Sequence, residues 1–164
     1  MSSTFGGGRF VKPASERLVR YPVAGGTVIS VGDFLYWDSS NSVVKPLSAL
    51  VGSGTAATDR ATVHDTFVGV STQQRLAAQT TAGFIEVITD VIYEADCASS
   101  SNYLPGDMVG AVSSGAAAAG AVSDQSVVEV SSASEAIGVV VNYTSGAITK
   151  VTCRIYGLAG RQKF

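Results

Sequence analysis

The chain has 164 residues, close to the roughly 150 residues typical of one domain, and 46% of them are apolar, so it can bury a core without disulfides or a metal. Its 11 basic and 13 acidic residues leave a net charge of −2, and 15% of the residues are charged, compared with about 25% in an average soluble domain. These values argue against a disordered chain and favour contact with other protein, and apolar stretches such as 115–122 and 136–141 are too short to span a membrane.

The first predicted element is an extended N-terminal arm, residues 1–17. It contains three consecutive glycines, a proline and no lasting periodicity, which is typical of an arm rather than a packed element. Apolar side chains in such an arm are expected to become ordered against another surface. We therefore predict that the arm binds a partner through Phe5, Arg9, Phe10, Val11 and Lys12.

From residue 18 onward, short β-branched and aromatic runs alternate with a period of two and are broken by Gly, Asp, Asn and Ser. Nine strands are predicted, over residues 18–23, 27–31, 34–37, 66–72, 84–94, 108–112, 126–130, 137–141 and 149–156. They indicate an all-β, compact antiparallel barrel or sandwich for the body, residues 18–164.

The clearest strand, 84–94, is expected to have one apolar face and one mixed face. The apolar face would carry Ile85, Val87, Thr89, Val91 and Tyr93. The mixed face would carry Glu86, Ile88, Asp90, Ile92 and Glu94. The same alternation in the last strand makes Cys153 a small core residue.

Helix signals are weak, because no segment keeps apolar residues at helical spacing together with caps. Single helical turns are left open near residues 47–50 and 72–78. The small-residue stretch 113–123 is interpreted as a loop or a flat turn of strand.

Two halves of the chain, about 18–96 and 97–158, share three landmarks in the same order. Gly32-Asp33 corresponds to Gly106-Asp107, and Gly69-Val70 corresponds to Gly138-Val139. The third match pairs residues 91–93 with 154–156. Gly-Asp before a strand is typical of a tight turn, and Gly within an apolar strand marks a bulge or a close approach. The body is therefore predicted to consist of two related halves.

Charge is unevenly distributed along the chain. Residues 1–20 carry four basic residues and one acidic residue, whereas no basic residue and eight acidic ones lie between Arg75 and Lys150. Four basic residues follow from Lys150 onward. Nucleic-acid tails are usually denser in charge, so no nucleic acid is expected as a partner. Two explanations stay open: basic arms that reach an acidic surface of a neighbour, or solvated charges at ordinary termini.

No apolar segment follows Met1, so no signal peptide is expected and synthesis is assigned to the host cytoplasm. Cys97 and Cys153 are then expected to stay thiols. Two cysteines with a single histidine make a poor metal set, so neither a metal nor a cofactor is expected.

Residues that could carry chemistry form no recognisable catalytic pattern, and the chain is expected not to be an enzyme. His64 beside Asp65 lacks a G-x-S-x-G elbow and is interpreted as a loop histidine that bonds locally. The stretch 52–55 lacks the Gly-Lys-Ser/Thr end of a phosphate loop and is interpreted as a mobile connector.

Three further sets of residues have simple structural interpretations. Asp33, Asp38 and Asp107 lack calcium-loop spacing and are assigned to turns. The carboxylate row on 84–94 is assigned to a solvated or interfacial face. An aromatic platform for sugars would consist of Tyr36, Trp37, Tyr93, Tyr103 and Tyr156, but scattered strand aromatics are more often core.

The segment VGDFLYWDSSNSVVKPLS, which starts at Val31, resembles a pattern of small β-rich proteins encoded beside major capsid genes, the capsid decoration or cement proteins of tailed bacteriophages. The resemblance covers about residues 23–156, through the pieces 31–38, 67–71, 105–111 and 135–141. The Gly-rich arm and the alanine-rich insert at 113–122 are not part of that pattern.

This resemblance implies a structural virion protein, often a homotrimer, that binds the capsid exterior and stabilises the shell by bridging major capsid protein subunits. The alternative is a head-fibre or host-attachment subunit that binds glycans. A ligand-binding barrel would need a pocket with convergent polar groups, which the sequence does not show.

Overall fold

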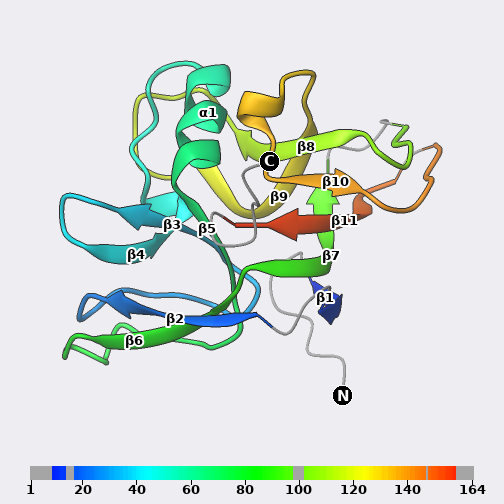
Figure 1. Cartoon of the computed structure of the whole chain (residues 1–164). Helices are drawn as coiled ribbons and strands as arrows, with labels where there is room; N and C mark the ends of the chain where they lie inside the picture. Colours follow the sequence, from blue (N-terminus) through cyan, green and yellow to red (C-terminus); the bar gives the residue numbers. More distant parts are fainter. Residues whose placement is uncertain (1–8, 14–16, 98–101, 147, 158–164) are drawn as a thin grey trace.

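The computed structural model describes residues 9–13, 17–97, 102–146 and 148–157, which form two β-sheets (Figure 1). The first sheet has the strand order β2(Leu18–Val23), β6(Gly83–Ile88), β5(Phe67–Ser71), β3(Phe34–Asp38) and β4(Val43–Pro46). The second has the order β1(Arg9–Pro13), β7(Asp90–Cys97), β11(Lys150–Tyr156), β10(Gly138–Val140), β8(Met108–Ser113) and β9(Val122–Glu129). The all-β prediction is confirmed.

Five strands of the second sheet form a closed barrel. β7 pairs antiparallel with β11 along its length and parallel with β9 at its end, where Asp96 lies opposite Ser126 and Cys97 opposite Val127. This last pairing joins the two ends of the run from β7 through β11, β10 and β8 to β9, so the barrel has no open edge there. β1 lies outside the ring, on β7.

The segment expected as one strand over 84–94 is two strands that belong to different sheets. The break falls at Thr89, whose N–H donates to the Arg17 carbonyl (3.2 Å) and whose carbonyl accepts from the Gly157 N–H (2.8 Å). Alternation holds on each side of the break. Ile85 and Val87 pack in the core of the first sheet, whereas Val91 and Tyr93 pack in the barrel.

Helix α1(Ala56–Thr66) was not expected from the sequence. Its buried residues are Asp59 and Val63, so it lacks the apolar stripe by which an amphipathic helix is recognised. It packs on β8 and on the short turn η2(Ala133–Glu135), with Arg60 Nε 2.5 Å from Glu135 Oε2. A contact partner far along the chain therefore stabilises this helix.

Other local predictions have mixed outcomes. The helical turn near 47–50 is confirmed as η1(Leu47–Ala49), whereas residues 72–78 form no helix. The strand expected at 27–31 is reduced to one bridge between Ile29 and Arg75, and β4 was not expected. The start of β9 at Val122 lies inside the stretch assigned to a loop or a flat turn.

Part of the expected arm is paired within the chain. The backbone of residues 9–13 forms β1, with Arg9 opposite Glu94 and Pro13 opposite Val91. The arm was expected to be unpacked, and period-two reasoning gave no sign of this pairing. Phe5 lies outside the described residues.

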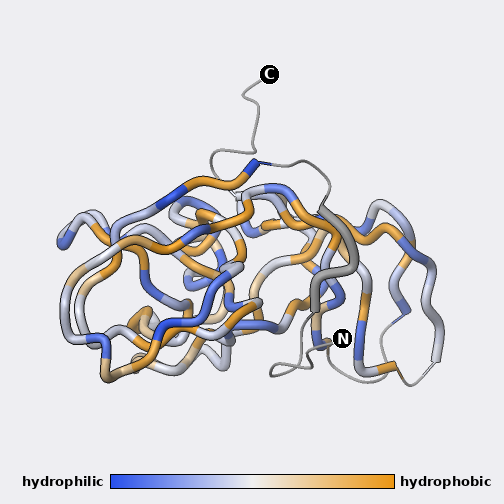
Figure 2. Tube along the Cα trace, turned by 90° about the horizontal axis from the view of Figure 1, so that it is seen from below, coloured by the Kyte–Doolittle hydropathy of each residue, from blue (hydrophilic) through white to orange (hydrophobic). Residues whose placement is uncertain are grey.

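Two apolar cores lie on the two faces of the first sheet. Phe34, Phe67 and Val70 join the barrel core, whereas Leu35 and Val68 belong to a second core inside the curled first sheet. The edge strands β2 and β4 contact each other across this second core. Figure 2 shows apolar stretches along the strands, separated by polar turns. Among the described residues, no helix has the length and apolar character needed to cross a lipid bilayer.

The two sheets repeat one topology. β2, β6, β5, β3 and β4 correspond in order to β7, β11, β10, β8 and β9. Residues 18–88 supply the first set and residues 90–156 the second, so the chain changes sheet at Thr89, whereas the expected boundary between residues 96 and 97 lies inside β7. The expectation of two related halves is confirmed.

The Gly-Asp landmarks have the same geometry in both halves. Gly32 (φ 93°) donates to the Ser71 carbonyl at 2.8 Å, and Gly106 (φ 96°) donates to the Val140 carbonyl at 2.9 Å. Asp33 Oδ2 accepts the Ser30 N–H at 2.6 Å, and Asp107 Oδ2 accepts the Leu104 N–H at 2.7 Å. Each aspartate therefore closes its own turn, as expected for this dipeptide.

The third landmark differs from the structural repeat. Val70 lies opposite Ile88, and the corresponding Val139 lies opposite Arg154. Ile88 in β6 is therefore the counterpart of Arg154 in β11. The expected equivalence of residues 91–93 with 154–156 is therefore wrong: these residues belong to β7 and β11, which pair with each other.

Candidate interaction surface

Acidic β7 lies between two basic segments. On one side, Lys150 Nζ contacts Asp96 Oδ1 at 2.7 Å, and Arg154 holds Asp90 through Nε (2.9 Å) and Nη2 (2.6 Å). The hydrogen bonds and charge of Asp90 raise the pKa of the Arg154 guanidinium. On the other side, Arg9 of β1 lies opposite Glu94 in register. Basic segments from both ends of the chain thus meet the acidic strand of the same chain.

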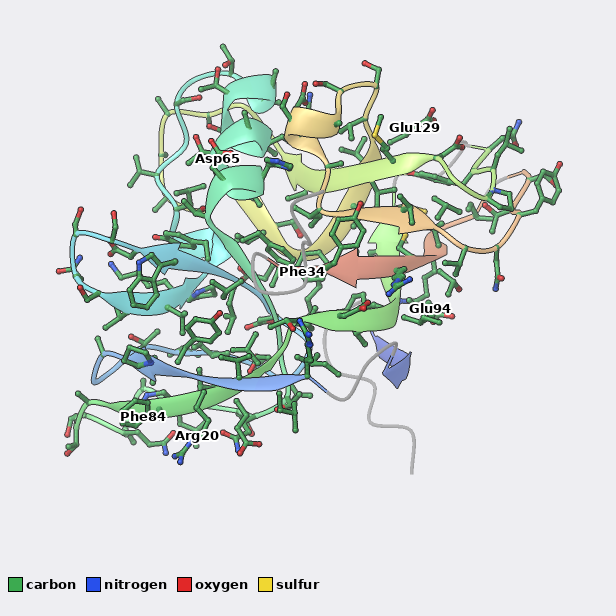
Figure 3. The ribbon with its side chains drawn as sticks, viewed as in Figure 1. Arg20, Phe34, Asp65, Phe84, Glu94 and Glu129 are labelled. Atoms are coloured by element: carbon green, nitrogen blue, oxygen red, sulfur yellow. The ribbon has the colours of Figure 1, made fainter. Side chains whose placement is uncertain are left out.

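The outer face of β2 and β6 is partly apolar and carries a cation. Leu18 is 55% exposed and Phe84 is 61% exposed. The Arg20 guanidinium carbon lies 5.4 Å from the centre of the Phe84 ring, within the range of a cation–π contact. Figure 3 shows Arg20 and Phe84 together at the outer side of this strand pair. A second exposed pair, Leu104 and Tyr143, flanks the bridge between Tyr103 and Thr144.

His64 lies on α1 rather than in a loop. Its Nδ1 is 2.6 Å from the carbonyl of Ala136, to which it donates. This partner is 72 residues away, so this bond is not the local one that the sequence predicted. The contact ties the helix to the barrel.

Residues 52–55 form the entry to α1 and pack against the alanine-rich insert. The Gly52 N–H donates to the Ala118 carbonyl at 3.0 Å, and the backbone N–H and hydroxyl of Ser53 both donate to Asp59 Oδ1. Burial raises the pKa of Asp59, but hydrogen bonds from Ser113 and Ser53 outweigh burial and lower it. The Asp59 carboxylate and the Ala118 carbonyl therefore already accept the N–H groups of Ser53 and Gly52.

The turn aspartates do not converge. Asp33 accepts from Ser30 and from Gln125 Nε2 (2.8 Å), whereas Asp38 accepts from Lys45 Nζ at 2.6 Å. The bonds from Lys45 and Asn41 lower the pKa of Asp38 to about 2. In the part of the chain that the structure describes, no group of three or more metal-ligating side chains comes together.

The remaining candidates are separated or buried. Glu86 lies in β6, whereas Asp90 and Glu94 lie in β7, so the expected carboxylate row does not exist as one face. Tyr36, Tyr93 and Tyr103 are buried, which confirms the core assignment for these three. Cys153 is also buried in the core, and burial raises the pKa of its thiol to about 12.

Two polar residues, the buried Arg75 and the half-buried Asp124, were not singled out from the sequence. The Arg75 guanidinium donates through Nη2 to the carbonyls of Gln79 (3.2 Å) and Thr81. Asp124 accepts the Ser48 N–H at 2.6 Å, and burial raises its pKa. Both residues bond to backbone carbonyl or N–H groups, which every residue type carries, so no sequence pattern could have identified these two residues.

No protein-family model matches the chain, and no curated protein matches it. Among solved structures, the N-terminal base of the head fibre protein gp8.5 of bacteriophage phi29 is similar to 87% of this chain and 98% of its own, with 11% sequence identity and a TM-score of 0.44. At this level the likeness carries no argument about what this chain does.

Proposed function

We propose that the chain is a structural protein of a tailed-phage virion that binds the outside of the capsid and stabilises it by bridging major capsid protein subunits. The observation that carries the proposal is the repeated Gly-Asp turn with its following strands. These turns and strands coincide with the segments 31–38, 67–71, 105–111 and 135–141 that resemble the decoration proteins. The residues that carry the resemblance therefore lie at equivalent turns and strands of the two halves.

The proposed mechanism acts through contact area and not through catalysis. A standard protein interface buries about 1,200–2,000 Å², and repetition over a shell multiplies a modest affinity. The arm residues Phe5, Arg9, Phe10, Val11 and Lys12 are proposed to contact the shell or a neighbouring copy. Assembly as a homotrimer belongs to the same proposal.

The alternative, a head-fibre or host-attachment subunit, rests on exposed aromatic side chains. Tyr143 is 63% exposed and Phe84 is 61% exposed, and rings of this kind can stack on sugars. A glycan array tests this alternative directly.

The decisive experiment mixes the purified protein with mature capsids that lack it. Sedimentation followed by gel quantification and cryo-imaging should show saturable binding at symmetric sites. Absence of binding to intact shells would reject decoration and favour the fibre alternative.

A further inference from the structure

The structural repeat gives β2 and β7 equivalent positions, residue by residue. Leu18 pairs with Ile88, and Ile92 pairs with Arg154, the counterpart of Ile88. Leu18 therefore corresponds to Ile92. By the same registers, Arg20 corresponds to Glu94, because their partners Glu86 and Thr152 are also equivalent.

The outer edge of β7 is filled along its length. β1 covers residues 91–94, and β9 covers Asp96 and Cys97. In the first sheet, β4 contacts the end of β2, where Val23 and Val44 belong to the same core. These two residues are the counterparts of Cys97 and Val127, which pair in the second sheet. No strand among the described residues lies on the part of β2 that corresponds to 91–94.

Pro22 stands where the first sheet would close onto β4, with which β2 does not pair. It corresponds to Asp96, whose backbone position joins β7 to β9. Because the pairing of β2 with β6 continues through Pro22, its nitrogen faces away from β6, toward β4. A proline has no N–H to donate there, so β2 lacks one donor that could join it to β4.

The two equivalent edges differ in charge. β7 presents Glu94, and the strand that covers it places Arg9 opposite. β2 presents Arg20 at the equivalent position, beside the exposed Leu18 and Phe84. A second copy of basic β1 would bring like charge to Arg20, which disfavours it as the occupant.

We propose that the edge of β2 at residues 18–20 is a docking site for an extended, acidic and apolar segment of another protein, which adds as an antiparallel strand with a carboxylate opposite Arg20. Main-chain hydrogen bonds would supply affinity, and Leu18, Phe84 and Arg20 would supply specificity. This inference concerns β2 alone and is independent of whether the chain binds a capsid.

The test uses the full chain and two synthetic peptides of residues 5–14, one unaltered and one carrying Arg9→Glu and Lys12→Glu. In NMR titrations of the ¹⁵N-labelled protein, the acidic peptide should shift the amides of residues 18–20 and bind roughly tenfold more tightly than the basic one, which corresponds to one well-placed charge pair. Arg20→Glu, at an exposed position, should reverse this preference.

Several outcomes would overturn the proposal. These are equal affinity for the two peptides, shifts confined to residues 91–94, or no binding of the acidic peptide at millimolar concentration. An unchanged preference in a folded Arg20→Glu variant would also reject it. In that case Arg20 would be a charge that keeps an edge strand from pairing.

Discussion

Replacing three glycines by alanine measures separately two destabilising effects of a side chain in this fold, backbone strain at positive φ and crowding against a carbonyl oxygen. Gly106 has φ 96° and no atom within 4 Å of the place that a Cβ would take, so alanine there meets backbone strain alone. At Gly138 the new Cβ would lie 2.5 Å from the Arg154 carbonyl oxygen, without a positive φ. Gly69 combines both, with φ 143° and a Cβ 2.3 Å from the Ile88 carbonyl oxygen. Gly69 and Gly138 are equivalent in the repeat, so they form a matched pair.

The expected losses of unfolding free energy follow from these contacts. A positive φ costs alanine about 1–2 kcal/mol, offset by about 0.4–1 kcal/mol from the stiffer unfolded chain, so Gly106→Ala should lose between about 0 and 1.6 kcal/mol. Crowding against a fixed carbonyl costs about 1–3 kcal/mol, so Gly138→Ala should lose about 2 kcal/mol. Gly69→Ala should lose about 3 kcal/mol, or about 6–12 °C in Tm for a chain of this size.

Urea unfolding of the three variants, followed by circular dichroism, gives these losses directly. The decisive comparison is between the matched pair. If Gly69→Ala loses no more than Gly138→Ala, backbone strain at Gly69 does not contribute, and the reasoning from the two close approaches is wrong.

Three further predictions concern burial, charge and the arm. Burial raises the pKa of Asp124, so the stability that its carboxyl contributes is full below the unfolded pKa of 3.8 and is lost as pH rises through the folded pKa. The unfolding free energy of Asp124→Asn should therefore rise relative to that of the natural chain between pH 4 and pH 7. The same difference in urea midpoint between the two proteins at both pH values would contradict this. Arg75→Met removes the two hydrogen bonds from a buried guanidinium to carbonyls and should lower the free energy of unfolding, measured in urea, by about 3 kcal/mol. A loss under about 1 kcal/mol would show that other contacts hold the loop over Arg75. Deleting residues 1–13 should leave the closed barrel intact and expose to hydrogen exchange the amides of Ile92 and Glu94, which face β1 rather than β11. It should also weaken binding to shells, and full shell affinity after the deletion would remove the arm from the mechanism.

Local patterns predicted the elements that depend on near neighbours. β2 was predicted with its observed bounds, because alternation with half-buried residues is a property of a single strand. The Gly-Asp turns were predicted for a similar reason: positive φ and a side-chain bond to a backbone N–H three residues away are local. Burial of Cys153 followed from the same alternation.

Elements that depend on distant partners were missed. Helix α1 buries little apolar surface of its own, and its contacts reach Glu135 and Ala136. The strand over 84–94 has continuous alternation, so its pattern contains no sign of the change of sheet at Thr89. That change follows from Arg17 and Gly157, which bond Thr89 from opposite ends of the chain.

The interaction surface shows the same division. By itself the sequence determined an all-β class, two related halves and basic ends with an acidic middle. Tertiary structure decided that basic β11 and β1 flank acidic β7, that Tyr36, Tyr93 and Tyr103 are core, and that β6 is the one described strand that pairs with β2. Side-chain alternation and turn chemistry act over a few residues, whereas strand order and edge exposure are set by pairing between segments far apart in the chain.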